Sequence, residues 1–152
     1  MQVKAGQLMV PIEEYPVISE QTKISSAAKL IVEAFQKKSD TWRGYELLIV
    51  SNAQKEKTGL LSMHHILKTT HSSFLRQIFR PNRPIIVKDI MQPIKHVYAD
   101  TENNLLEISR LFMSSGLNSI PVFDGNDPVG IIRAIDLFWY LEDMIMKGEI
   151  TS

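Results

Sequence analysis

The chain has 152 residues, of which 44% are hydrophobic and 22% charged, with 17 basic and 17 acidic side chains and a formal net charge of zero. This composition is typical of a soluble globular protein, and the zero net charge argues against a broad nucleic-acid-binding surface. The absence of cysteine excludes disulfide scaffolds, cysteine zinc sites and thiol catalysis, and agrees with the cytoplasmic location that we expect. We expect no membrane span, because no apolar run approaches about 20 residues, and no signal peptide in "MQVKAGQLMVP".

The first part of the chain predicts a strand, a helix, two strands and a second helix. The segment "YPVIS" at 15–19 predicts a strand, and apolar residues at helical spacing between 24 and 35 predict a helix. Two further strands are predicted at 45–50 ("YELLIV") and 58–62 ("TGLLS"), joined by a polar loop. A helix then begins near Met63.

A basic segment, "THSSFLRQIFRPNRP" at 70–84, follows this first part. Its second half, "RQIFRPNRP", contains one aromatic residue, Phe79, and three arginines, Arg76, Arg80 and Arg83. Contact with nucleic acid or with the phosphates of a ligand is one interpretation. We favour a solvated linker, because the zero net charge of the chain supports it.

The last part of the chain repeats the order of the first. "HVYA" at 96–99 predicts a strand, and a helix follows with Asn104 and Glu107 as a capping box and Gly116 at its end. "SIPVF" at 119–123 and "PVGII" at 128–132 predict strands joined by the turn "DGND". A final helix is predicted from about Asp136 to Lys147.

Two pairs of short segments support an internal repeat. "LMVPI" at 8–12 matches "IMQPI" at 90–94, and "GLLSMHH" at 59–65 matches "GIIRAID" at 130–136. The segments keep the same order in both parts of the chain, which makes a repeated α/β unit the best interpretation.

The segments "IMQPIKHVYAD", "SSGLNSIPVFD" and "GIIRAIDL" resemble the CBS domain family. The resemblance is close over residues 87–147 and weaker over 3–68, where "YELLIV" lacks the proline and the preceding loop is longer. It implies an α/β fold of two βαββα repeats packed sheet to sheet with pseudo-two-fold symmetry, the tandem arrangement called a Bateman module. We place repeat 1 at 1–68, the linker at 69–86 and repeat 2 at 87–148, and expect a stand-alone CBS protein.

The resemblance also implies a function. The cleft between CBS repeats commonly binds AMP, ADP, ATP or S-adenosylmethionine, and such modules regulate another protein, often as homodimers. We therefore expect a regulatory nucleotide sensor that needs no cofactor, and not an enzyme, because no catalytic motif is present. A ligand-free scaffold or dimerisation module is the alternative, and a nucleic-acid-binding regulator is less favoured.

The ligand motif of the family is Gly-h-x-Thr/Ser-x-x-Asp, where h is aliphatic, and neither copy in this chain is complete. Repeat 2 has Asp136 at the acidic place but Arg133 at the hydroxyl place. Asp136 would accept hydrogen bonds from ribose hydroxyls or cap a helix, and Arg133 would bind phosphate or lie solvated or paired with a carboxylate. We expect this copy to be the better site, and its ligand to carry phosphate.

Repeat 1 has Ser62 at the hydroxyl place and His65 at the acidic place. Ser62 would contact phosphate or cap the next helix, and we favour the cap. His65 is a poor ribose ligand, because a neutral imidazole offers one acceptor and no negative charge.

Three further groups of residues are candidates for contact with an adenine ring, a second copy of the chain or a metal ion. By analogy with the family, we expect four apolar residues to line a pocket for the adenine ring: Ile94, Val97, Ile120 and Pro121. Plain core packing is the alternative for each of them. A dimer surface, or alternatively a cover for the core, is expected at Trp139, Tyr140, Met144 and Met146. We predict no metal site at His64, His65 and His71, because no nearby carboxylate completes a ligand set.

Overall fold

The computed structural model describes residues 3–37, 47–68 and 85–148. Over these described residues the chain forms two four-stranded sheets, and it divides into two compact units. One unit comprises residues 15–96, and the other combines residues 1–14 with residues 97–152. The α/β fold expected from the sequence is confirmed.

The unit of residues 15–96 contains the sheet β2–β3–β4–β5. Strand β2 (Val17–Ser19) runs parallel to β3 (Leu47–Ser51), which pairs antiparallel with β4 (Lys57–Ser62), and β4 pairs antiparallel with β5 (Gln92–Pro93). The helices among its described residues are α2 (Ile24–Lys37), α3 (Met63–Leu67) and α5 (Val87–Ile90). The core packs one face of the sheet against α2 and α5 and contains Ile18, Ala27, Ile31, Leu48, Val50, Leu61 and Val87.

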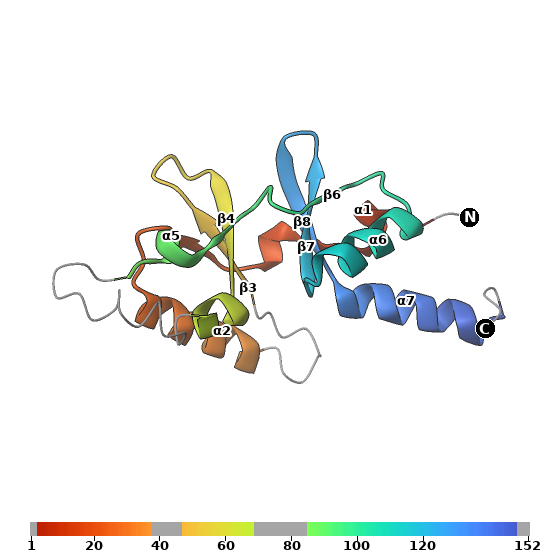
Figure 1. Cartoon of the computed structure of the whole chain (residues 1–152), viewed down its shortest axis with the longest axis horizontal. Coiled ribbons are helices and arrows are strands. Elements are labelled where there is room, and N and C mark those ends of the chain that lie inside the picture. The colour runs from red at the N-terminus through yellow and green to blue at the C-terminus, as the bar shows by residue number, and fades with distance from the viewer. Residues whose placement is uncertain (1–2, 38–46, 69–84, 149–152) are drawn as a thin grey trace. The chain divides into compact units, whose positions relative to one another are not determined.

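The other unit contains the sheet β1–β8–β7–β6. Strands β7 (Ser119–Asp124) and β8 (Asp127–Arg133) form a hairpin, flanked by β6 (Ala99–Asp100) and by β1 (Val10–Pro11), after which Ile12–Glu14 form a 3₁₀ turn. The helices among its described residues are α1 (Ala5–Leu8), α6 (Leu105–Ser115) and α7 (Ala134–Met146), which lie to the right of the hairpin in Figure 1. The core contains Ala5, Ala99, Ile108, Ile120, Val122, Ile132 and Leu137.

The short strand near the start of each sequence repeat belongs to the sheet of the other repeat. Val10 pairs with Ile131 of β8, and Gln92 pairs with Leu60 of β4. Both strands have two residues and end in proline, which lacks an N–H and is tolerated at a sheet edge. The compact units therefore follow a different division from the sequence repeats, whose limits at 1–68, 69–86 and 87–148 stay a prediction.

Strands β1 and β5 are here called the exchanged strands, and the methionine next to each of them packs on a glycine. A Cβ atom built on Gly130 would collide with the sulfur of Met9, and one built on Gly59 would collide with the sulfur of Met91. The segment "LMVPI" therefore contacts "GIIRAID" in one unit, and the matching segment "IMQPI" contacts "GLLSMHH" in the other.

Most predicted elements agree with the structure, but some limits differ. Strand β2 starts at Val17 and not at residue 15 as predicted. The capping box of α6 is confirmed, since Asn104 Oδ1 accepts the N–H of Glu107 at 2.9 Å and Glu107 Oε1 accepts the N–H of Asn104 at 3.1 Å. The strand predicted at 96–99 is wrong in extent, because β6 starts only at Ala99. The final helix begins at Ala134 rather than Asp136. No helix in the described ranges combines the length and the apolar character needed to cross a membrane.

Candidate functional site

The turn from β8 into α7 holds the side chains of Arg133 and Asp136 together. Arg133 Nε donates to Asp136 Oδ2 at 2.9 Å, and Arg133 Nη2 donates to Asp136 Oδ1 at 2.6 Å. The same carboxylate accepts the backbone N–H of Arg133 at 3.0 Å. Each side chain of this bidentate ion pair is only 11% exposed.

The pair leaves the carboxylate of Asp136 little free capacity. A carboxylate has about four lone-pair positions, and the three hydrogen bonds from Arg133 use most of them. Asp136 does cap helix α7, but it is not the N-cap residue itself. Arg133 is the N-cap residue, and Asp136 caps from the third helical position because α7 begins two residues earlier than predicted.

The turn from β4 into α3 has the same backbone arrangement with a neutral pair. His65 Nδ1 accepts the backbone N–H of Ser62 at 2.9 Å, and Ser62 Oγ accepts the backbone N–H of His65 at 3.3 Å. Ser62 is therefore the N-cap of α3, as the favoured interpretation predicted. The equivalent residues thus carry two opposite charges in one turn and no charge in the other.

Burial is the main cause that lowers the pKa of His65 below its ordinary value of 6.5, and the positive charge of Lys68 adds to it. A hydrogen bond with the side chain of Gln92 opposes the shift, and His64 lowers the pKa further. The imidazole is therefore neutral at pH 7, with Nδ1 as the acceptor for Ser62. Gln92 belongs to the exchanged strand β5, so sequence reasoning on repeat 1 alone missed it.

The expected adenine-pocket residues are distributed over both units. Ile94 is buried just after β5, and its N–H donates to the carbonyl of Thr58 at 3.0 Å. In the other unit Val97 is partly buried against the core, Ile120 is part of the core and 1% exposed, and Pro121 is buried opposite Ile131. Their assignment to a ligand site stays a prediction. Beside Ile94, the buried hydroxyl of Thr58 lacks any hydrogen-bond partner within the described residues.

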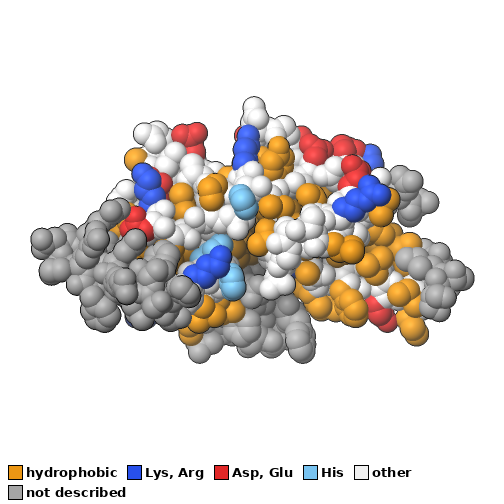
Figure 2. Space-filling view, viewed as in Figure 1, with side chains coloured by type: hydrophobic (Ala, Val, Ile, Leu, Met, Phe, Trp, Pro, Cys, Tyr) orange, Lys and Arg blue, Asp and Glu red, His pale blue; other side chains and the backbone are white. Residues whose placement is uncertain are grey.

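Helix α7 exposes several large apolar side chains. Trp139 is 43% exposed and Met146 is 76% exposed, and they are joined by Ile135, Phe138 and Ile145. Figure 2 shows hydrophobic side chains gathered over this helix. Tyr140 and Met144, by contrast, line a hollow of about 450 Å³ together with residues of α6, so these two partly cover their own unit.

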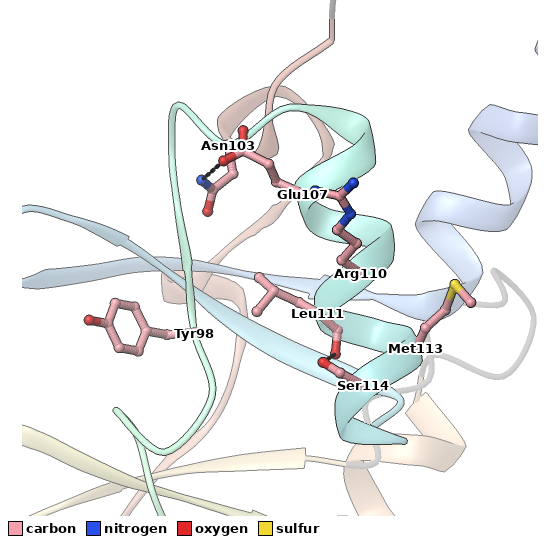
Figure 3. A pocket seen from close by; sticks show the side chains of 7 residues that line it. All are labelled: Tyr98, Asn103, Glu107, Arg110, Leu111, Met113 and Ser114. Carbon is pink, nitrogen blue, oxygen red and sulfur yellow. Dashed lines mark hydrogen bonds between the residues drawn. The ribbon is translucent and has the colours of Figure 1, made fainter.

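A second hollow, of about 610 Å³, lies between Tyr98 and helix α6 (Figure 3). Its lining comprises Tyr98, Asn103, Glu107, Arg110, Leu111, Met113 and Ser114. Tyr98 packs edge to face on Phe123, with ring centroids 5.2 Å apart, and Glu107 already accepts a hydrogen bond from Asn103. None of the sequence-predicted site residues lies in it.

Two predictions of the sequence involve residues outside the described ranges. These are His71 of the rejected metal set and the basic segment with Arg76, Phe79, Arg80 and Arg83. Over the residues that are described, no three histidines or carboxylates are grouped as metal ligands.

Comparison with known proteins gives one family and one fold. The model of the CBS domain family matches residues 87–143, and no curated protein matches the chain. The structure of CBSX2 in complex with AMP is 20% identical with a TM-score of 0.71, covering 93% of this chain and 98% of that chain. The CBS-pair protein CBSX2 from Arabidopsis thaliana gives 20% and 0.69, covering 96% and 99%. The cytosolic domain of the Mg²⁺ channel MgtE in complex with ATP gives 21% and 0.63, covering 91% and 48%.

Proposed function

Residues 87–143 belong to the CBS domain family and the whole chain has the fold of a CBS pair, and from these facts we propose that the protein is a regulatory module that binds an adenine nucleotide. The observation that carries the proposal is the turn from β8 into α7, where Arg133 and Asp136 occupy two places of the family's ligand motif inside the matched segment. Similar structures contain AMP or ATP, which supports this class of ligand.

Asp136 and Arg133 divide the recognition of the nucleotide in this proposal. The carboxylate accepts hydrogen bonds from the ribose hydroxyls, and the guanidinium binds phosphate through two parallel N–H groups. Within the same unit, Val97, Ile120 and Pro121 supply apolar surface for the base by analogy with the family, and Ile94 does so in the other unit. The turn that contains Ser62 and His65 forms a weaker site, because it offers no negative charge to the ribose.

Regulation follows from a shift in populations. A nucleotide stabilises whichever conformation of the module binds it more tightly, and the difference in affinity between conformations sets the size of the shift. A regulated partner protein then responds to the favoured conformation.

Thermal unfolding with AMP, ADP, ATP and S-adenosylmethionine tests the proposal. A nucleotide at 100 times its dissociation constant stabilises the folded state by about 2.7 kcal/mol. A clear rise in the midpoint with at least one of these compounds supports nucleotide binding. No rise with any of them at millimolar concentration contradicts it and favours the ligand-free scaffold.

We further propose that two copies of the chain associate through the exposed apolar side chains of α7, including Phe138 and Met146. Replacing Phe138, which is 61% exposed, by Asp places a charge on this face without disturbing the core. Sedimentation or light scattering is expected to show a dimer for the wild type and a monomer for Phe138→Asp. A wild type that is monomeric at high concentration contradicts this second proposal.

A further inference from the structure

The carboxylate of Asp136, which we propose to bind the ribose, is already paired with the guanidinium of Arg133. Arg133 holds both oxygens of Asp136, and the two side chains are largely withdrawn from water at 11% exposure each. Charge-assisted bidentate pairs are among the strongest hydrogen-bonded contacts in proteins. A ligand that uses Asp136 must therefore compete with Arg133 for it.

From this geometry we infer that Arg133 is a specificity gate, which admits anionic nucleotides and excludes the neutral or cationic compounds adenosine and S-adenosylmethionine. The inference rests on the proposed function, because it concerns the same site. Without ligand, Arg133 holds Asp136, and with a nucleotide bound it holds the phosphate.

The gate works through the balance of charge. When ribose hydroxyls displace Arg133 from Asp136, a neutral ligand breaks this largely buried charge-assisted pair and offers the guanidinium no anion in exchange for the carboxylate, which is unfavourable. A nucleotide phosphate gives the guanidinium a new bidentate partner, so the total number of charge-assisted hydrogen bonds is preserved. Phosphate and ribose must then bind together for either to bind well.

The turn with Ser62 and His65 shows what the same backbone does without the gate. Its N-cap residue carries a hydroxyl, and the side chain three residues later accepts the backbone N–H as Asp136 does. Arg133→Ser therefore keeps the local arrangement while it removes the competing cation.

Binding of AMP and adenosine to the wild type and to Arg133→Ser tests the gate. We expect the wild type to bind AMP much more tightly than adenosine. In Arg133→Ser we expect the affinity for adenosine to rise about tenfold and the affinity for AMP to fall about tenfold, which reverses or abolishes the preference. Lys147→Ser is the matched control, because it removes one cation from an exposed pair with Asp143 on the same helix and should leave both affinities unchanged.

A second measurement needs no variant and covers the case in which Arg133→Ser fails to fold. Inorganic phosphate offers Arg133 an anion that is separate from the nucleoside, so adenosine should bind the wild type about tenfold more tightly in phosphate than in chloride of equal ionic strength. By linkage, adenosine should tighten phosphate binding by the same factor.

The outcomes distinguish the role of Arg133 in specificity from nucleotide binding itself. If AMP binds the wild type but neither the variant nor added phosphate changes the preference for AMP over adenosine, the gate is wrong and nucleotide binding stands. If neither compound binds the wild type or the variant, both fail.

Discussion

The sulfur of Met9 occupies the space where a side chain at Gly130 would lie. Met91 and Gly59 are arranged in the same way in the other unit. The glycine that opens each copy of the ligand motif is therefore required by packing against the methionine beside an exchanged strand, whether or not a ligand binds.

The two glycines differ in how well they should tolerate alanine. At Gly59 the three atoms nearest to the new Cβ all belong to the flexible side chain of Met91, whereas at Gly130 the new Cβ also lies 2.9 Å from the backbone oxygen of Val10. We expect Gly130→Ala to destabilise the fold by about 2–3 kcal/mol and Gly59→Ala by about 1 kcal/mol, measured by urea unfolding. Adding Met91→Ala should relieve the clash at Gly59, while Met9→Ala should relieve only part of that at Gly130. Equal effects of the two glycine substitutions would contradict this packing argument.

The ion pair at the start of α7 should contribute more to stability than the pair at its end. Asp136→Asn keeps an oxygen for the backbone N–H of Arg133 but removes the negative charge from a largely buried bidentate pair, so we expect a loss of about 2–3 kcal/mol. Asp143→Asn breaks an exposed pair with Lys147 and should change the stability by less than about 0.5 kcal/mol. Chemical denaturation of both variants measures the difference, and a similar effect of the two would show that the inner pair is not special.

His65 should make the stability of the protein depend on pH. Because the folded state lowers the pKa of His65 below 6.5, the stabilising contribution of the neutral imidazole is complete above pH 6.5 and is lost as the pH falls through the folded-state pKa. Gln at this position accepts the N–H of Ser62 without titrating. Unfolding at pH 7.5 and at lower pH should therefore show a smaller decline for His65→Gln than for the wild type. Identical declines would mean that the pKa of His65 is not lowered.

The buried hydroxyl of Thr58 should be dispensable for folding. Since its Oγ1 has no partner in the described part of the chain, Thr58→Val removes an unsatisfied polar atom and should be neutral or stabilising by up to about 1 kcal/mol. Thr58→Ser keeps the hydroxyl and loses the methyl group, so it should not stabilise. A clear loss of stability in Thr58→Val alone would indicate a partner for the hydroxyl in solution.

The sequence predicted the order of helices and strands well because most elements carry a strong local signal. The capping box of Asn104 and Glu107 and the glycine at the end of α6 are examples. The exchange of β1 and β5 could not be predicted in this way, because two-residue strands have no periodicity and their partners lie far along the chain. The matching segments "LMVPI" and "IMQPI" were the available signal, but they did not show which sheet each strand joins.

The candidate site was predicted as a set of residues but not as a set of contacts. The motif placed Arg133 and Asp136 in the same turn, and pairing with a carboxylate was one of the alternatives given for Arg133. Whether a long side chain turns toward its own helix or toward a ligand depends on packing and burial, which the spacing of residues does not encode. For the same reason, the contact of Gln92 with His65 was not foreseen.

Calorimetric titration of AMP and ATP into the wild type, Asp136→Asn and Asp143→Asn measures whether the protein binds a nucleotide through Asp136. We expect saturable binding of at least one nucleotide to the wild type, a similar affinity for Asp143→Asn, and a loss of at least about tenfold for Asp136→Asn, with circular dichroism confirming that both variants are folded. Binding that Asp136→Asn leaves unchanged, or no binding of either nucleotide at millimolar concentration, would contradict it.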